Sequence, residues 1–333
     1  MEIRDIPVPS PGPGEVRIRI AEAGICGSDL HIYHSDIAIP VKPPVVVGHE
    51  FSGVVDAVGE GVTLCAPGDR VVSETAYEYC GVCELCRSGF YNLCAGRRTL
   101  GYWYDGVFTS YTVVPEGRVH RIPDEVSFTS AAMAEPLACV THAVGDLSVL
   151  SPTDVALVTG PGAIGLMTAQ VVKSYGATVV LSGAGADGER LSLARSLGVD
   201  RTVNIEEESL AEVLEELTGG AGPDAAFECS GSPAAINTAV RLVKKRGWFV
   251  QIGLAGKPIQ FDIEALNYRE IKFTGSLGSR WLNWRMALDM MKTGKVRLEP
   301  LVTHKFPLAD WRVAFDVFEQ KQGCKVFLLP AQD

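Results

Sequence analysis

The stretch Val155-Ala-Leu-Val-Thr-Gly160-Pro-Gly162-Ala-Ile-Gly165-Leu166 determines the fold of a large part of this chain. An apolar run of strand length leads directly into G-x-G-x-x-G and then into a helical pattern. The glycines permit a tight turn and let backbone N–H groups approach a pyrophosphate, whose charge the helix N-terminus stabilises. The stretch therefore predicts a dinucleotide-binding loop, and the predicted contacts are Gly160, Gly162, Ala163, Ile164 and Gly165.

Segments that follow this loop alternate between strand and helix. The predicted strands are residues 155–159, 178–182, 201–204, 225–229 and 248–252, and the predicted helices are residues 162–174, 188–197, 210–217 and 234–244. Regular alternation of this kind is typical of a doubly wound parallel sheet. We therefore expect an α/β fold with a Rossmann cofactor domain at residues 148–278.

The part of the chain before the loop has a different pattern. Short β-runs at residues 16–21, 51–58, 70–72 and 108–114 are broken by Gly and Pro, which predicts a β-rich domain over residues 1–147. Residues 279–333 carry helices predicted at 284–293 and 309–320 and a short strand near 302–306. We expect them to return to the first domain.

Four cysteines lie within fifteen residues, in Cys80-Gly-Val-Cys83-Glu-Leu-Cys86-Arg-Ser-Gly-Phe-Tyr-Asn-Leu-Cys94. The C-x2-C-x2-C-x7-C spacing suits one tetrahedral ion bound by thiolates at about 2.3 Å, which predicts a closed structural zinc site. A disulfide cluster is one alternative, but it is typical of secreted chains. An iron–sulfur cluster is another, although the nearest bacterial pattern has three residues and then Cys-Pro where this chain has seven residues.

A second set of metal-binding side chains is spread along the chain. Cys26-Gly-Ser28-Asp29-Leu-His31 and Gly48-His49-Glu50 lie in the β-rich part, and Glu135-Pro-Leu lies where we expect the two domains to meet. A thiolate, an imidazole and a carboxylate from separate segments can bind a catalytic zinc and leave a fourth position open. Each residue alone could instead be an ordinary buried thiol, a core histidine or a helix-start carboxylate.

Taken together, these motifs resemble the zinc-dependent medium-chain dehydrogenase/reductase family, and within it the polyol, threonine and sugar-phosphate dehydrogenases. The resemblance runs from about Glu2 to Leu329. It includes Ala-Gly-Ile-Cys-Gly-Ser-Asp-Leu-His, Gly-His-Glu-Phe-Ser-Gly-Val-Val, the four-cysteine lobe, Ala-Glu-Pro-Leu-Ala and the glycine loop. It implies that the β-rich domain is GroES-like and that the chain binds two zinc ions.

The resemblance also implies roles for single residues. Cys26 and His49 would bind the catalytic zinc, with Glu50 and Glu135 as direct or water-mediated ligands, and Cys80, Cys83, Cys86 and Cys94 would bind the structural zinc. Glu135, where the ethanol-type members have a cysteine, favours the polyol-like branch. Ser28 would take the proton of the substrate hydroxyl and pass it, through the cofactor ribose, to His31. Members usually have some fifteen further residues at the N-terminus, so a chain that truly starts at Met1 would leave one sheet edge unpaired.

The end of the second Rossmann strand leaves the cofactor open between NAD and NADP. An acidic residue usually binds the adenosine ribose there, but this chain has Ser182-Gly183-Ala184. The small side chains would leave room for a 2′-phosphate, which Arg190 or Arg195 could meet, although an arginine on that helix is as easily a surface charge.

Composition limits the partners and the location. The net charge of −10, from 30 basic and 40 acidic residues, argues against nucleic acid or an anionic membrane as the main partner. No apolar run approaches the ~20 residues that cross a bilayer, and no secretory signal pattern is present. We expect a cytoplasmic protein, and the family usually forms homodimers or homotetramers, often through segments like residues 261–275.

These observations predict a zinc-dependent oxidoreductase. It would oxidise a secondary alcohol of a polyol, a sugar, a sugar phosphate or an amino alcohol, and transfer hydride to NAD(P). Zinc would lower the pKa of the substrate hydroxyl towards neutrality. The alternatives are a catalytically weak, zinc-stabilised nucleotide-binding protein and a zinc-independent quinone or enone reductase of the same fold, which would lack both the cysteine lobe and the Cys26–His49 pair.

Overall fold

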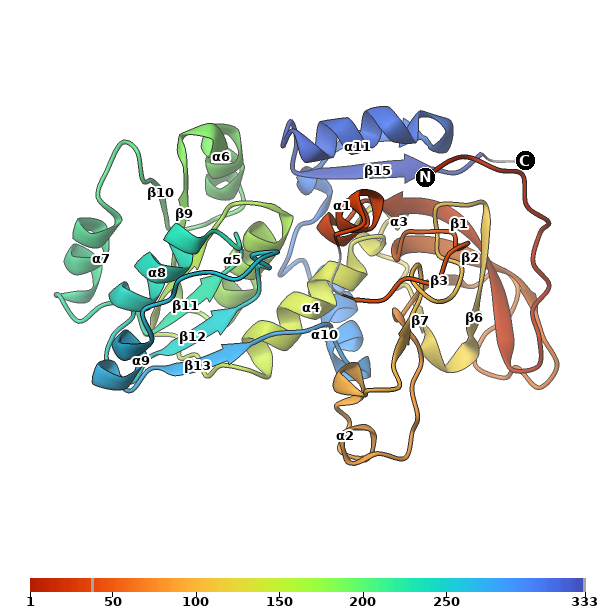
Figure 1. The fold of residues 1–333 in the computed structure, drawn as a ribbon, viewed down its shortest axis with the longest axis horizontal. Coiled ribbons are helices and arrows are strands. Elements are labelled where there is room, and N and C mark those ends of the chain that lie inside the picture. Colours follow the sequence, from red (N-terminus) through yellow and green to blue (C-terminus); the bar gives the residue numbers. More distant parts are fainter. Residues whose placement is uncertain (37–38, 332–333) are drawn as a thin grey trace. The chain divides into compact units, whose positions relative to one another are not determined.

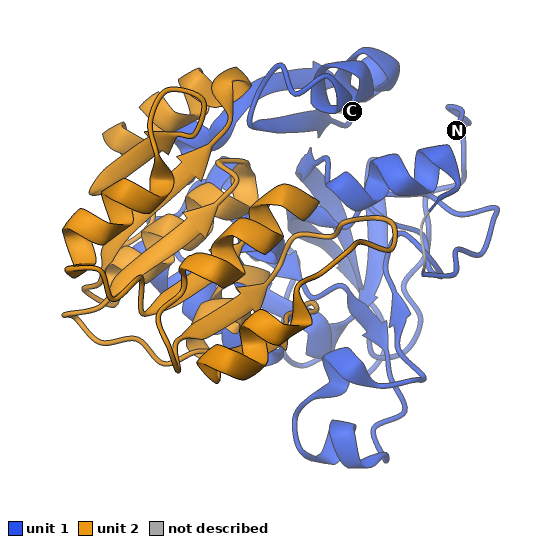
Figure 2. Ribbon diagram, turned by 60° about the vertical axis from the view of Figure 1, so that its left-hand side comes forward, with its two compact units in different colours: residues 1–138, 279–292, 298–333 blue, residues 139–278, 293–297 orange. Residues whose placement is uncertain are grey.

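The computed structural model describes residues 1–36 and 39–331, and it divides into two compact units (Figure 2). Unit 1 comprises residues 1–138, 279–292 and 298–333, and unit 2 comprises residues 139–278 and 293–297. One helix, α4 (Ala134–Gly145), continues from the first unit into the second. At this first of its four crossings, the chain passes from unit 1 to unit 2 inside a helix.

Unit 2 contains a sheet of six parallel strands in the order β10-β9-β8-β11-β12-β13 (Figure 1). The strands are β8 (Val155–Thr159), β9 (Thr178–Gly183), β10 (Arg201–Asn204), β11 (Ala225–Glu228), β12 (Trp248–Gln251) and β13 (Lys272–Gly275). The helices are α5 (Ala163–Ser174), α6 (Gly188–Ser196), α7 (Leu210–Thr218), α8 (Pro233–Leu242) and α9 (Ile263–Arg269). This sheet confirms the predicted doubly wound fold.

The core of unit 2 explains the continuous apolar runs in its strands. Leu157, Val180, Val203, Ala226 and Phe249, one from each of five neighbouring strands, form one fully buried cluster. Strands buried on both faces need no polar alternation, and this makes the runs recognisable in the sequence. The order of the strands reverses between β8 and β11, so this point of the sheet is the crevice at which open α/β sheets bind ligands.

Unit 1 contains a sheet in the order β14-β15-β1-β2-β3-β7, with β6 also paired to β1. These strands are β1 (Glu15–Gly24), β2 (Glu50–Val58), β3 (Arg70–Ser73), β6 (Tyr111–Pro115), β7 (Val119–Arg121), β14 (Val302–Pro307) and β15 (Lys325–Leu329). A separate small sheet pairs β4 (Ala76–Glu78) with β5 (Arg98–Thr99). The helices are α1 (Gly27–His34), α2 (Glu84–Arg87), α3 (Phe128–Ala131), α10 (Trp281–Lys292) and α11 (Trp311–Glu319).

Strand β15 brings the end of the chain to the strands that carry the first motifs. Ala23 of β1 pairs with Leu328, and Gly24 pairs with Phe327. β13, β15 and α1 were not predicted from the sequence, and the strand predicted at 108–114 begins three residues before β6 and ends one residue before its end. Each of these segments is short, and its pairing or packing partner lies far away in the sequence, so local periodicity gave little signal. Within residues 1–36 and 39–331, no helix has both the length and the apolar character to span a membrane.

Candidate active site

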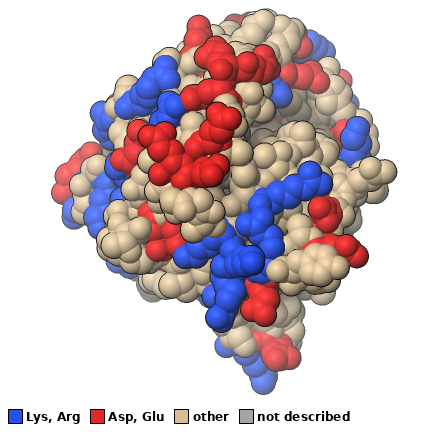
Figure 3. Space-filling view, turned by 90° about the vertical axis from the view of Figure 1, so that its left-hand side faces the viewer, with Lys and Arg blue, Asp and Glu red and all other residues tan. Residues whose placement is uncertain are grey.

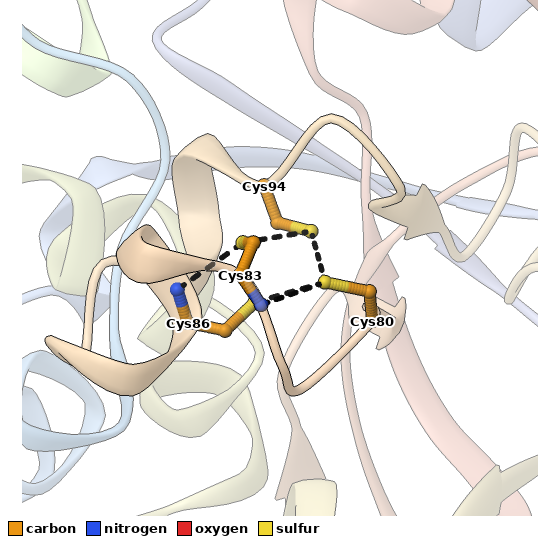
Figure 4. Close-up of side chains that lie close together, drawn as sticks. All are labelled: Cys80, Cys83, Cys86 and Cys94. Carbon is orange, nitrogen blue, oxygen red and sulfur yellow. Dashed lines mark hydrogen bonds between the residues drawn. The ribbon is translucent and has the colours of Figure 1, made fainter.

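The four cysteines of the lobe converge on one point (Figure 4). Cys80 Sγ lies 3.6 Å from Cys94 Sγ and 3.8 Å from Cys86 Sγ, and Cys83 Sγ lies 3.9 Å from Cys94 Sγ. A tetrahedron with metal–sulfur bonds of about 2.3 Å has edges of about 3.8 Å. The cluster therefore has the dimensions of a single four-thiolate zinc site.

These distances bear on the two alternatives for the lobe. A disulfide needs an S–S distance of about 2.05 Å, and all nine cysteines of the chain are free thiols. An iron–sulfur cluster spreads its thiolates over more than one iron, so its four sulfur atoms would not share one small tetrahedron. A single ion fits the four sulfur atoms better than either alternative.

The backbone around the lobe stabilises thiolate charge. The N–H groups of Val82 and Cys83 lower the pKa of the Cys80 thiol to about 6. Gly81 (φ +70°) and Gly89 (φ +80°) adopt the left-handed conformation that lets the chain turn around the sulfur atoms. Backbone hydrogen bonds also lower the pKa of Cys94, whereas burial and the neighbouring cysteines raise the pKa of Cys86 to about 12. Thiolate is the form that binds metal, so the backbone of the lobe prepares Cys80 and Cys94 for zinc.

A second cluster brings together Cys26, His49 and Glu50, whose potential ligand atoms all lie within 4.8 Å of one another. Cys26 precedes α1, while His49 and Glu50 stand at the start of β2. His49 and Glu50 are buried, with 6% and 1% of their surface exposed. Gly48 has φ +91°, and a Cβ atom there would lie 2.6 Å from the Phe108 ring, so a glycine must precede His49.

Asp29 orients this cluster, although the sequence analysis did not single it out. Its fully buried carboxylate accepts a hydrogen bond from the Cys26 backbone N–H at 2.9 Å, and its other oxygen lies 3.5 Å from His49 Nδ1. Burial lowers the pKa of His49, but the charge and hydrogen bonding of Asp29 outweigh it, and the pKa of His49 is raised. A carboxylate behind a histidine fixes the ring and leaves its other nitrogen for a metal.

Lys325 of β15 forms a buried ion pair with Glu50, which the sequence analysis also missed. Lys325 Nζ donates to the Ile25 carbonyl at 2.9 Å. Burial alone would lower the pKa of Lys325. The charges of Glu50 and Cys26 raise the pKa by more than burial lowers it, so the amine stays a cation. A Cβ atom at Gly24 would lie 2.7 Å from Glu50 Oε2 and 2.9 Å from Lys325 Cε, so glycine makes room for the pair.

Glu135 lies in the first turn of α4. Its charge is one of those that raise the pKa of Lys325, so Glu135, like Glu50, interacts electrostatically with this lysine. It is not among the three side chains whose ligand atoms come within 4.8 Å. Its role as a zinc ligand therefore stays a prediction.

Ser28 and His31 both lie on α1, three residues apart and hence on one side of the helix. Ser28 Oγ is buried and has no hydrogen-bond partner of normal length in the described part of the chain. His31 Nδ1 lies 2.9 Å from Asp36 Oδ1, and its side chain is 39% exposed. Ser28 also lies near the Tyr102 hydroxyl, because its hydrogen bond lowers the pKa of Tyr102 against the larger rise from burial. The Ser28 hydroxyl can therefore bond either Tyr102 or a ligand, and the His31 imidazole is in contact with water.

In unit 2, the predicted glycine loop lies at the end of β8 and the start of α5. Gly160 has φ +87°, and a Cβ atom there would lie 2.6 Å from Ser230 Cβ. A Cβ atom at Gly165 would lie 1.9 Å from the Gly160 carbonyl oxygen. The first N–H groups of α5 have no partner within the helix, and such groups bind phosphate.

The turn after β9 is closed by Asp187. The Ala184 N–H donates to Asp187 Oδ2 at 3.0 Å, and Arg190 lies 3.4 Å from Asp187 Oδ1. A Cβ atom at Gly183 would lie 2.8 Å from Pro161 Cγ. Ser182 and Gly183 thus end β9 as predicted in sequence, while Arg190 is paired with a carboxylate that the sequence analysis left without a role.

Comparison with known proteins decides the family. The model of the alcohol dehydrogenase GroES-like domain matches residues 12–124, and that of the zinc-binding dehydrogenase domain matches residues 163–293. The sorbitol dehydrogenase of Halalkalibacterium halodurans is 41% identical over 329 residues, which is 98% of this chain and 95% of the relative. The chain belongs to the zinc-binding alcohol dehydrogenase family.

Two further members of this family are similar over nearly their whole length. The D-arabitol-phosphate dehydrogenase of Enterococcus avium is 39% identical and covers 98% of this chain and 93% of its own. The crystal structure of 2R,3R-butanediol dehydrogenase from Bacillus subtilis has a TM-score of 0.87 and 32% identity, and the match covers 99% of this chain and 96% of that one.

Membership of the zinc-binding alcohol dehydrogenase family confirms the predicted resemblance, the fold class and the class of enzyme, an NAD(P)-dependent dehydrogenase that acts on alcohols. The side chains of the two clusters fit the two zinc ions that the family implies. Asp29 was within reach of the sequence analysis, because it lies inside the quoted Cys26–His31 motif. Lys325 was not, because only the pairing of β15 with β1 brings it to Glu50.

Proposed function

We propose that this enzyme oxidises a secondary alcohol of a polyol or a sugar phosphate and transfers hydride to NAD or NADP. The observation that supports this most directly is the Cys26–His49–Glu50 cluster. It offers a thiolate, an imidazole and a carboxylate to one ion, which leaves room for a substrate oxygen in a four-coordinate zinc site. The four-cysteine lobe has no such vacancy and serves stability.

The residues in and around the cluster would have different roles in the reaction. Zinc, when bound, supplies Lewis acidity that lowers the pKa of a substrate hydroxyl. Cys26 and His49 hold the ion, and Asp29 keeps the His49 ring in place. Ser28, whose buried Oγ has no hydrogen-bond partner of normal length among the described residues, would accept the proton of the substrate hydroxyl while giving up its own hydroxyl proton. The half-exposed His31 would take up the relayed proton and release it to water.

Vicinal diols are the substrate class that we favour. Sorbitol, arabitol phosphate and 2,3-butanediol, the compounds in the names of the three relatives, all carry two hydroxyl groups on adjacent carbons. The cluster contains a carboxylate and a buried lysine rather than apolar side chains alone. Because Glu50 and Lys325 already pair with each other, the preference for a diol depends on the shared chemistry of the three named compounds, and the polar surroundings are compatible with it.

A substrate panel with metal counting tests this function. Polyols, sugar phosphates, amino alcohols and simple secondary alcohols would be offered with NAD and with NADP, and the reduced cofactor would be followed by its absorbance. We expect the highest kcat/KM with a vicinal diol and about two zinc ions per chain. Turnover of a quinone or an enone without zinc would instead favour the reductase, and the absence of any turnover would favour a nucleotide-binding protein.

We further propose that the enzyme forms a homodimer or homotetramer through the edge of the unit 2 sheet. Strand β13 is an edge strand, and large apolar side chains around it are exposed, namely Leu254, Ile263, Tyr268, Phe273 and Leu277. Edge strands and exposed apolar patches are typical of interfaces. Light scattering after gel filtration would test this, with Tyr268→Glu expected to shift the protein to monomer.

Charge and cysteine chemistry agree with small-molecule substrates and a cytoplasmic location. The face in Figure 3 carries separate areas of acidic and of basic side chains, rather than one continuous basic surface for nucleic acid. All nine cysteines are free, as is usual in a reducing compartment. Fractionation of the source cell would test the location.

A further inference from the structure

A buried carboxylate, Glu228, lies at the C-terminal end of β11 and has no role in the function proposed above. Its side chain is fully buried. Its hydrogen-bond partners among the residues described here are neutral groups. Burying a charge costs free energy unless hydrogen bonds compensate for the lost water. The hydrogen bonds around Glu228 must therefore compensate for the water that its carboxylate loses on burial.

Five donors surround this carboxylate. Oε1 accepts hydrogen bonds from the Thr159 hydroxyl at 3.1 Å, from the Ser230 N–H at 2.8 Å and from the Ser230 hydroxyl. Oε2 accepts from the Gly231 N–H at 2.9 Å and from Gln251 Nε2 at 2.6 Å. An ionised carboxylate is purely an acceptor, so all five contacts suit the charged form.

The donors come from strands β8 and β12 and from the turn that follows β11. Thr159 of β8 and Gln251 of β12 are the in-register neighbours of Glu228 in the parallel sheet. One carboxylate therefore connects the carboxyl ends of β8, β11 and β12, and it does so where the strand order reverses between β8 and β11. Dinucleotides bind at this edge and at this point of an open α/β sheet.

Glu228 also holds the Ser230–Gly231 turn, which lies in close contact with the glycine loop and with Gly253 after β12. Both polar groups of Ser230 are bonded to Oε1, and Ser230 Cβ would be 2.6 Å from a Cβ atom at Gly160. Gly253, after β12, would place a Cβ atom 2.3 Å from the Gly231 N–H nitrogen and 3.0 Å from Glu228 Oε2. The turn at Ser230–Gly231 is thus held between the glycine loop and the end of β12.

We propose that Glu228 is a positioning residue for the cofactor, which holds the Ser230–Gly231 turn in the shape that receives the nicotinamide half of the dinucleotide. The two halves of a doubly wound sheet each bind one mononucleotide. The glycine loop and β9 belong to the half for adenosine, and β11 to β13 form the other half. Glu228 stands at the first strand of that second half.

The test is cofactor binding without alcohol, measured by calorimetry on the zinc-loaded protein. The probes are AMP, which contains only the adenosine half, and whichever of NAD and NADP the unaltered chain binds more tightly. In Glu228→Gln the carboxamide NH2 must face the N–H of either Ser230 or Gly231, whichever way it is turned. We expect the dinucleotide to bind about tenfold more weakly or worse, with the affinity for AMP changed less than twofold.

Three further variants distinguish a specific effect of Glu228 on the cofactor from a general loss of structure. Glu212→Gln, an exposed carboxylate on α7, should leave both affinities unchanged. Thr159→Val and Ser230→Ala each remove one neutral donor and should weaken dinucleotide binding a few-fold, which keeps the test open if Glu228→Gln fails to fold. Unchanged dinucleotide binding in Glu228→Gln, or an equal loss for AMP, would overturn the proposal.

This experiment is also independent of the substrate. The inference rests on the cofactor part of the proposed function and not on the alcohol. A chain that binds the dinucleotide normally and oxidises no diol would contradict the proposed substrate class while leaving the role of Glu228 intact.

Discussion

The two metal clusters of unit 1 are built in opposite ways. The lobe takes all its ligands from fifteen consecutive residues, lies partly exposed, and is shaped by local turns. The Cys26–His49–Glu50 cluster draws on two separate segments, has a partly exposed Cys26 beside the buried His49 and Glu50, and depends on Asp29 and Lys325 as well. A closed local site can support stability alone, whereas an open site needs surrounding charges that hold each ligand while one position stays vacant.

The largest effect should follow from removing a ligand of the open cluster. His49→Ala should lower turnover by about a thousandfold or more, because zinc supplies several kcal/mol of charge stabilisation in such reactions. Steady-state kinetics per folded molecule would measure this, with thermal unfolding recorded alongside, because the variant also leaves the buried Asp29 carboxylate without its histidine. His120→Ala is the matched control, since His120 is also buried, with Nε2 3.2 Å from Glu74 Oε1, and stacks on Trp284. It should lose stability and keep its turnover per folded molecule; the reverse pattern would contradict the assignment.

The next effect concerns the charge that balances Glu50. Lys325→Met leaves a buried carboxylate without its lysine, which should lower the free energy of unfolding by about 3 kcal/mol or more. Chemical denaturation of the zinc-loaded protein would measure it. Lys305→Met on the adjacent strand β14 removes a partly exposed pair with Glu22 and should cost at most about 1 kcal/mol. Equal losses of unfolding free energy in the two variants would mean that the buried Lys325–Glu50 pair stabilises the protein no more than the partly exposed Lys305–Glu22 pair.

A smaller effect should follow from weakening the support of His49. Asp29→Asn keeps the shape of the side chain and removes its charge, so zinc affinity or activity should fall about 10- to 100-fold. Titration with a chelator, with release of zinc from each site followed separately, would measure the affinity. The four-cysteine lobe should hold its zinc as before. If Asp29→Asn releases zinc from the lobe as readily as from the open cluster, the two sites are not independent.

The same contrast explains how much of each cluster could be predicted from the sequence. Cys80 to Cys94 could be identified because their spacing alone defines a tetrahedral site, and the glycine loop because strand, turn and helix are contiguous. Cys26 and His49 needed the family resemblance, since each is ordinary by itself. Asp29 lies inside the Cys26–His31 motif, but its contact with His49 comes from a separate segment. Lys325 and Glu228 act through strand pairings, and the sequence shows such pairings only after the sheet order is known.

The smallest effect concerns the choice of cofactor in unit 2. Asp187→Ala should free Arg190 to meet a 2′-phosphate, and the ratio of kcat/KM for NADP to that for NAD should rise a few-fold, since such a partly exposed ion pair is worth about 1 kcal/mol at most. Kinetics with both cofactors would show it. Glu189→Ala, an exposed neighbour on α6, should not change the ratio. A ratio that falls in Asp187→Ala would assign the 2′-phosphate to another group.

The most direct measurement of the central claim is the number of zinc ions per chain, determined by mass spectrometry of the metal in the unaltered protein and in two variants. We predict two ions in the unaltered chain and one in Cys26→Ser, which should be folded and inactive. We also predict a retained open-site ion in Cys94→Ser, in whatever fraction stays folded. Two ions in Cys26→Ser, or full turnover in that variant, would contradict the assignment of Cys26, His49 and Glu50 as the catalytic metal site.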